Sequence, residues 1–253
     1  KPTDNCLYIC IRSFHMDKIF NYQASFFGEF SSLKSDEENI QRFLKTLEGF
    51  MFMPVPMTSI DIRTNKLIVD NRMQFISPDK KYSITILPER IDFTYNLNNS
   101  DSIEEDFFKI QKEMLNYISL LNSILSDKRG NRLANSTVFS LREFSNRQEL
   151  NEFIKKFSNK NRFYEDRDDI IEWQVRYNSK QEIIFNNKVE NSNCIINLTI
   201  PNNPPMNNTV LMTLDINTEP RLNTSRFILT DLLGYIQKAT SMFIELVKKA
   251  ENE

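Results

Sequence analysis

The sequence predicts an α+β protein made of two similar halves, each an antiparallel sheet covered by a long amphipathic helix. Two observations predict this class. Apolar residues recur at spacings of three and four over residues 102–128 and again over 225–249, which is typical of amphipathic helices. Between these segments, apolar and polar residues alternate with a period of two, which is typical of strands in antiparallel sheets.

The first long helix carries start and stop signals. Ser102 and Glu105 match a capping box, and Gly130 follows the last apolar position of the stripe. Two shorter amphipathic segments predict helices over 36–47 and 147–157, the second capped by Ser145 or Asn146.

The expected strands are short and follow one another directly. Asn178-Ser179 and Glu190-Asn191-Ser192 are expected to form hairpin turns in the second half. The predicted strands cover residues 6–13, 59–63, 66–75, 82–87, 90–96, 137–144, 170–177, 182–189, 194–200 and 210–217.

The order of elements repeats along the chain. A strand, a short helix, several hairpin strands and a long helix occur in 1–130, and the same order occurs in 131–253. We therefore expect an internal duplication with two halves joined near Gly130. The two sheets either continue into one or pack side by side.

The composition restricts the function. Only four glycines occur in 253 residues, and they stand apart, so they form neither a P-loop nor a dinucleotide fingerprint. The formal net charge of −2 creates no overall field that would attract nucleic acid. His15 is the only histidine, and three cysteines indicate reduced thiols in a cytoplasmic protein. No stretch approaches the roughly 20 apolar residues of a membrane span, and we expect no cofactor.

The segment 50–57 is the best candidate for an interaction surface. It is strongly apolar and contains two prolines, and methionine and phenylalanine suit an adaptable contact surface. An edge strand tucked into the core is the alternative interpretation. The candidate protein-interaction residues are Phe50, Phe52, Met53, Val55 and Met57.

Basic and aromatic residues interleave over 155–164, a combination that can hold single-stranded nucleic acid. The alternative is the basic end of a helix followed by a loop. The candidate nucleic-acid contacts are Lys155, Lys156, Lys160 and Arg162.

Carboxylates gather at 165–172, where they form either a magnesium site for hydrolysis or a solvated turn. A nuclease-like pattern is half present, because Pro78-Asp79 precedes Glu89, but the expected lysine is missing.

The strand Leu214-Asp215-Ile216-Asn217 before the last helix, and the central strand at 137–144, carry a resemblance to a known family. In this arrangement the chain resembles a sporadically distributed bacterial family of unknown function. Where that family often has Arg-Tyr-Ile/Val-Asn, this chain has Leu141-Arg142-Glu143-Phe144-Ser145-Asn146. The resemblance implies a setting in phage-defence or toxin–antitoxin operons.

The missing catalytic motifs, the balanced charge and the 50–57 segment favour a non-catalytic binding or scaffold protein. Its partner is expected to be another protein or a second copy of the chain. Two alternatives stay open: a metal-dependent hydrolase or nuclease that uses the 165–172 carboxylates, and a small-ligand sensor with a pocket between sheet and helix.

Overall fold

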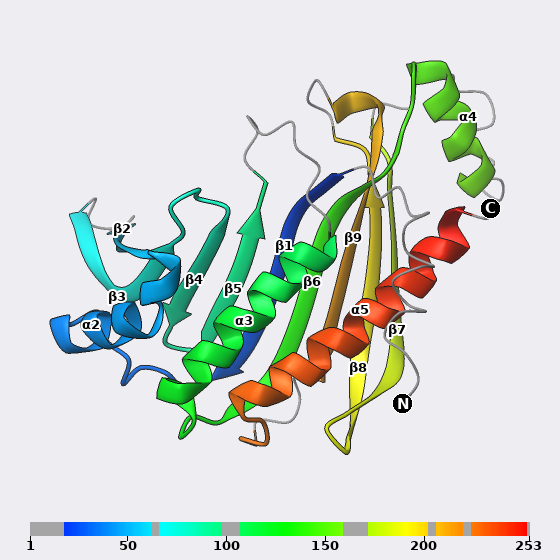
Figure 1. Ribbon diagram of the computed structural model, residues 1–253. Coiled ribbons are helices and arrows are strands. Elements are labelled where there is room, and N and C mark those ends of the chain that lie inside the picture. Colours follow the sequence, from blue (N-terminus) through cyan, green and yellow to red (C-terminus); the bar gives the residue numbers. More distant parts are fainter. Residues whose placement is uncertain are drawn as a thin grey trace.

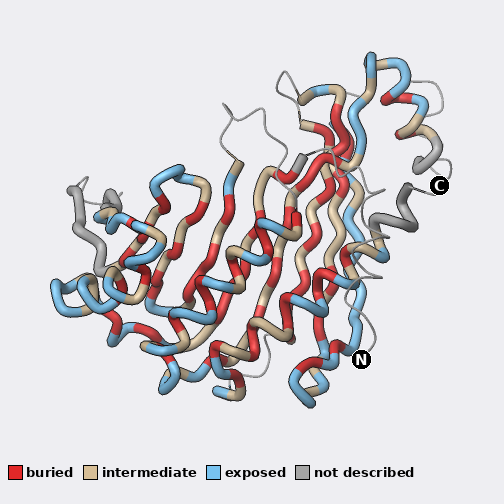
Figure 2. Tube along the Cα trace, in the orientation of Figure 1, coloured by how far each residue is buried: buried red, intermediate tan, exposed pale blue. Residues whose placement is uncertain are grey.

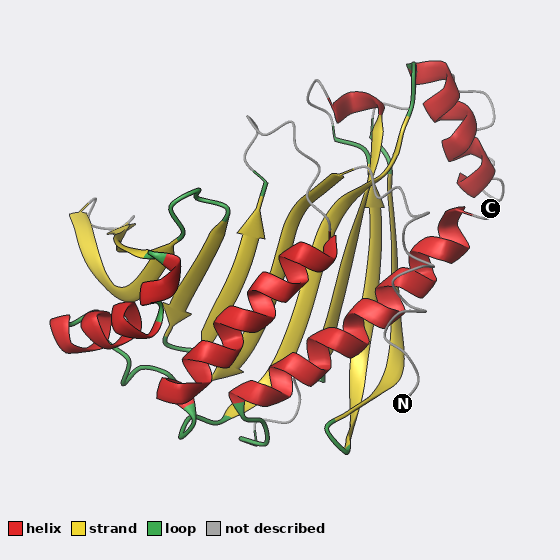
Figure 3. Ribbon diagram, viewed as in Figure 1, coloured by secondary structure: helices red, strands yellow, loops and turns green. Residues whose placement is uncertain are grey.

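The computed structural model describes residues 18–61, 66–97, 107–158, 172–201, 206–219 and 224–251. In this part of the chain, one nine-stranded antiparallel sheet packs with four α-helices (Figure 1, Figure 3). The predicted α+β class is confirmed, and the strands of both halves join into a single continuous sheet.

The three strands predicted at 170–177, 182–189 and 194–200 are only two, and two of the other strands have their predicted bounds. Nine strands are described. They are β1 (Lys18–Gly28), β2 (Met53–Asp61), β3 (Lys66–Ile76), β4 (Tyr82–Leu87), β5 (Arg90–Asn96), β6 (Gly130–Glu143), β7 (Gln174–Phe185), β8 (Lys188–Thr199) and β9 (Thr209–Thr218).

The helices also lie where the apolar stripes predict them. They are α2 (Glu37–Thr46), α3 (Phe107–Leu125), α4 (Arg147–Ser158) and α5 (Leu229–Glu251). Asp36 caps α2 by accepting a hydrogen bond from the Asn39 N–H, and Asn146 caps α4 in the same way. The predicted capping residues of α3, Ser102 and Glu105, lie outside the described residues.

The spatial order of the strands is β2-β3-β4-β5-β1-β6-β9-β8-β7. The first described strands of 1–130 and 131–253, β1 and β6, are therefore neighbours at the centre of the sheet. Each also pairs with the last strand of its own half, β1 with β5 and β6 with β9. The helices α3 and α5 lie next to each other on the same face of the sheet (Figure 1).

Gly130 stands where the chain leaves α3 and enters β6. A Cβ atom there would lie 2.5 Å from a ring carbon of Phe26 and 2.6 Å from the carbonyl oxygen of Phe27. Only glycine allows this close approach of backbone and ring. The predicted junction of the two halves thus coincides with the beginning of β6, while a boundary between two domains stays a prediction.

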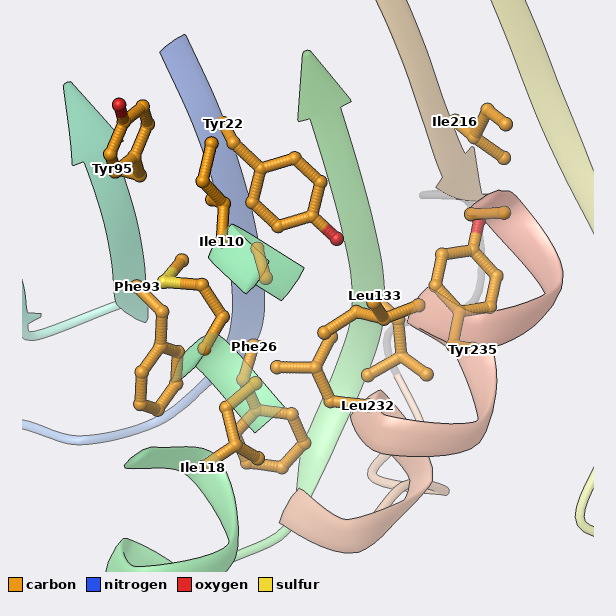
Figure 4. Close-up of a cluster of buried hydrophobic side chains, with 14 of the residues drawn as sticks. Tyr22, Phe26, Phe93, Tyr95, Ile110, Ile118, Leu133, Ile216, Leu232 and Tyr235 are labelled. Atoms are coloured by element: carbon orange, nitrogen blue, oxygen red, sulfur yellow. The ribbon is translucent and has the colours of Figure 1, made fainter. Parts of the chain in front are cut away.

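The core lies between the sheet and the helices α3 and α5. Along β1, the side chains of Tyr22, Ala24 and Phe26 point toward the helices and are buried, as expected for a period of two. Figure 2 shows buried and intermediate residues alternating along the central strands. Figure 4 shows Phe26 close to Ile118 of α3 and Leu232 of α5, so one apolar cluster joins the sheet to both long helices.

The predicted turns at Asn178-Ser179 and at Glu190-Asn191-Ser192 are wrong. Residues 178–179 lie inside β7 and residues 190–192 inside β8. The hairpin turns instead at Asn186 and Asn187, whose φ angles are 46° and 60°. Asparagine tolerates this left-handed conformation, and such a turn fits the twist of a two-residue hairpin.

Strand β1 was not predicted, and the strand expected at 6–13 lies outside the described residues. The alternation in β1 is obscured because Phe26 and Phe27 are adjacent, so that apolar rings point to both faces. A register shift between Ile19 and Asn21 disturbs it further. Strand β2 also begins earlier than predicted, at Met53, since its two prolines lie on an edge strand.

Candidate binding surface

The face of the sheet opposite α3 and α5 is here called the bare face. Among the described helices, α2, α3 and α5 pack on the other face, where Phe43 of α2 stacks on Phe75 of β3. On the central strands, the bare face carries the residues that alternate with the core positions. They are Asn21, Gln23, Ser25 and Phe27 of β1, Arg90, Asp92, Thr94 and Asn96 of β5, and Arg132, Ala134, Ser136 and Val138 of β6.

Phe27 lies near the end of the central strand β1, between two arginines. The strand register places Arg90 of β5 and Arg132 of β6 directly beside it. The guanidinium carbon of Arg132 lies 4.7 Å from the centroid of the Phe27 ring, and that of Arg90 lies 5.8 Å from it. Both distances fall within the range of cation–π attraction. The aromatic ring therefore holds two positive charges on the outer surface of three adjacent strands.

A chain of hydrogen bonds fixes the orientation of Arg90. Its Nε donates to Oδ2 of Asp92 at 2.8 Å, and Oδ1 of Asp92 accepts from the Ser25 hydroxyl at 2.6 Å. The Ser25 oxygen in turn accepts from Nε2 of Gln23 at 3.0 Å. Ser25 and Asp92 are buried although they belong to the bare face. These side chains are therefore already ordered before anything binds, which lowers the entropic cost of binding.

Arg132 differs from Arg90 because it forms no ion pair with a described residue. Among the described residues, it makes no hydrogen bond and no ion pair, and its contacts are the stacking on Phe27 and a weaker electrostatic interaction with Tyr235. Its Nε atom is buried and has no acceptor. A ligand carboxylate would therefore accept hydrogen bonds from the terminal guanidinium nitrogens of Arg132, and not from the buried Nε.

Elsewhere on the bare face, polar side chains bond to one another, most of them from one strand to the next. Near β9, Asn193 donates to Asn217, and Asn217 donates to Asp215, at 3.3 and 3.1 Å. Similar bonds join Asn21 to Asn96, Gln74 to Thr85, and Gln174 to Asn197. The surface around the arginines is thus polar and largely satisfied within itself.

The 50–57 segment is divided between core and surface. The rings of Phe50 and Phe52 meet Tyr117 of α3 edge-on, with centroids 4.9 and 5.1 Å apart. Phe52 is 5% exposed, whereas Met53 is 51% exposed and Val55 is half-buried. The side chain of Met57 lies outside the described part. The two phenylalanines therefore anchor the segment to α3, and Met53 alone of the predicted interaction residues is largely exposed among those described.

Of the predicted nucleic-acid contacts, Lys155 lies half-buried on α4. The side chain of Lys156, and all of Lys160 and Arg162, lie outside the described residues. The nucleic-acid surface therefore stays a prediction.

Of the carboxylate cluster at 165–172, only Glu172 lies in the described part, and it is exposed. The described residues contain no group of three or more histidine, cysteine or acidic side chains that could hold a metal ion. The nuclease-like pattern is not assembled, because Asp79 lies before β4 and Glu89 after it, at opposite ends of that strand.

No protein-family model matches the chain, and no curated protein matches it either. In the described part of the chain, no helix is both long and apolar enough to cross a membrane.

The sequence contained one indication of the bare face. Arg90, Asp92 and Thr94 alternate with Ile91 and Phe93 in β5, which indicates a strand with one polar face, but alternation does not show which strands lie beside it.

Proposed function

We propose that the protein is a non-catalytic binding protein and that its bare face docks a protein partner. The observation that carries the proposal is the Arg132 guanidinium, which is stacked on Phe27 and has no ion partner among the described residues. A partner surface that presents an acidic side chain at this position would satisfy the charge. Arginine beside an aromatic ring is also typical of the residues that dominate protein interfaces.

The hydrogen bonds of the bare face favour binding over catalysis. A general acid or base needs a titratable group that is free to exchange a proton with a substrate. Asp92 instead accepts hydrogen bonds from Ser25 and Arg90 on its two oxygens. The amides of the bare face bond to neighbouring amides, hydroxyls and carboxylates, so the surface is preorganised for recognition.

The charge distribution favours a protein partner over nucleic acid. Arg90 is neutralised by Asp92, and Asp215 adds a carboxylate to the same face. Backbone phosphates are bound by runs of unpaired cations, and bases stack on free aromatic faces. Here the Phe27 ring is engaged by two guanidinium groups. One acidic side chain at Arg132 fits this surface better than a polyanion.

The bacterial, cytoplasmic setting and the link to a defence-type operon remain part of the proposal. They depend on the resemblance described above and on the cysteine content. They suggest that the partner is encoded beside the gene of this protein.

The internal duplication also belongs to the proposal. It is supported by the equivalent places of β1 and β6, each of which pairs with the last strand of its own half, β5 or β9. A long helix follows that last strand in both halves. Superposition of an experimental structure should therefore align β1 with β6, β5 with β9 and α3 with α5. Failure of α3 to align with α5 would contradict the duplication.

The binding function can be tested with charge reversal. The full chain is co-expressed with the products of the neighbouring genes, and complexes are isolated by affinity purification and gel filtration. We expect one product to co-elute with the wild type and with Lys109→Glu, an exposed position on α3, but not with Arg132→Glu. If no product co-elutes, or if Lys109→Glu abolishes the complex as well, the proposal is wrong.

A further inference from the structure

The two edges of the sheet differ in how they are protected. At one edge, Pro54 and Pro56 of β2 lack the N–H groups that a further strand would need. At the other edge, β7 has neither proline nor glycine over its whole length of 12 residues. Within the described strands, β7 pairs only with β8, so its outer edge offers backbone donors and acceptors. Such an edge readily pairs with another strand.

The exposed charges of β7 show a specific pattern. Arg176 and Glu182 both point to the bare face, both are exposed, and neither makes an ion pair among the described residues. Lys180 lies between them and is already bound to Glu219, with a distance of 2.9 Å from Nζ to Oε1. Strand β7 therefore carries one unpaired positive and one unpaired negative charge, separated along the strand.

We propose that β7 pairs antiparallel with β7 of a second copy of the chain, in the register that places Ser179 opposite Ser179 of that copy. This register brings Arg176 opposite Glu182 of the other copy. The two-fold axis repeats the pair, so both unpaired charges of each chain are neutralised. Opposite charges directly across antiparallel strands are favourable, and like charges are unfavourable.

Neighbouring registers are less favourable. The two-fold axis is perpendicular to the sheet, so two residues that pair must have their side chains on the same face. The axis must therefore pass between two copies of one residue, and a different register moves it to another residue of β7. Centring on Lys180 would place the two lysines against each other, and centring on Asn178 would place Arg176 opposite Lys180. Centring on Gln181 would place Glu182 opposite Lys180, which already binds Glu219. It would also leave Arg176 beside the hairpin turn of the other copy.

The pairing has a consequence for the bare face. The two-fold axis keeps the long helices of both copies on one side, so two nine-stranded sheets join into one and the two bare faces become continuous. The dimer would then present Arg132 twice on one surface, which suits a partner that is itself repeated. This inference does not depend on the identity of that partner.

Disulfide trapping tests the register. Cys194 lies opposite Ser179 on β8, so the test uses the full chain with Cys194→Ala as well as Cys6→Ser and Cys10→Ser. In this background, Ser179→Cys should form a disulfide-linked dimer under mild oxidation. Gln181→Cys is the matched control, because in the proposed register it faces Tyr177 of the other copy. Cross-linking of Gln181→Cys, or none from Ser179→Cys, would overturn the proposal.

A charge swap tests the same pairing without cysteines. In sedimentation equilibrium, Arg176→Glu and Glu182→Arg should each raise the dimer dissociation constant by about tenfold, because each creates two like-charge pairs. The double variant restores opposite charges and should return to within about threefold of the wild type. Circular dichroism checks that all three variants fold. A wild type that stays monomeric, or a double variant weaker than both singles, would contradict the proposal.

Discussion

Arg132 of β6 stacks on Phe27 of β1, with its guanidinium carbon 4.7 Å from the ring centroid. Phe26, the residue before Phe27 in β1, points to the opposite face and is fully buried beneath the long helices. Two consecutive phenylalanines thus have different roles. One fills the core, and the other supports a charge on the surface, which makes this end of the central strands both rigid and positively charged on the bare face.

Arg132 should contribute little to folding. Replacing it with glutamine removes a partly exposed cation–π contact, which contributes about 0.5–1 kcal/mol to stability. Replacing Phe26 with alanine leaves a cavity in the core and should cost about 3–5 kcal/mol. Urea unfolding followed by circular dichroism measures both. A loss of several kcal/mol for Arg132→Gln would show that this arginine is structural.

A charge at Phe52 should lower the stability of the fold much more than a charge at Met53. Phe52→Asp places a carboxylate in the contact with Tyr117 and should destabilise the fold by several kcal/mol. Met53→Asp, at the adjacent exposed position, should change stability by less than about 0.5 kcal/mol. Thermal melting of the two variants provides the comparison. Equal melting temperatures would contradict the burial of Phe52.

The ion pair between Lys188 and Asp231 should be structural. Asp231 is 4% exposed in its side chain and also accepts the Ile228 N–H at the start of α5. Lys188→Met leaves this carboxylate without its cation and should cost about 2 kcal/mol, less than for a fully buried pair because Lys188 is partly exposed. Lys180→Met breaks the more exposed pair with Glu219 and should cost under about 1 kcal/mol. Urea midpoints should rank the variants in this order, and the reverse order would contradict it.

Stability should fall at alkaline pH. Burial raises the pKa of the Tyr22 and Tyr235 hydroxyls above their usual value of about 10. Below that value both groups are neutral in the folded and unfolded chain, and stability is complete. Above it the unfolded chain loses these protons first, so stability decreases as the pH rises. Urea midpoints from pH 8 to 11 should fall less steeply for Tyr22→Phe/Tyr235→Phe than for the wild type. Identical slopes would contradict the prediction.

Local patterns predicted much of the fold. The helices α2 and α4 lie within one residue of their predicted ends, and β4 and β5 have their predicted bounds. These elements have a single buried face, so the period of their apolar residues is clear. Strand β1 was missed because Phe26 and Phe27 place aromatic rings on both faces.

The candidate site could not be predicted from the sequence in the same way. Arg90, Phe27 and Arg132 come from three strands that are distant in the chain, and they meet only because β1 lies between β5 and β6. The contact of the two arginines with the ring depends on how these strands pair, and local sequence patterns do not reveal the pairing of distant strands. The composition of the 50–57 segment predicted an interaction surface, yet Phe50 and Phe52 pack against α3.

Site-specific photo-cross-linking tests the central claim, that the partner docks on the bare face, most directly. A benzophenone amino acid replaces Ser136, a half-buried bare-face residue of β6, or Lys112, an exposed residue of α3, in the full chain co-expressed with its neighbouring gene products. We predict that irradiation of the purified complex joins the partner to position 136 and not to position 112. Cross-links at position 112 together with none at 136 would show that the partner binds the helical side, and the account would be wrong.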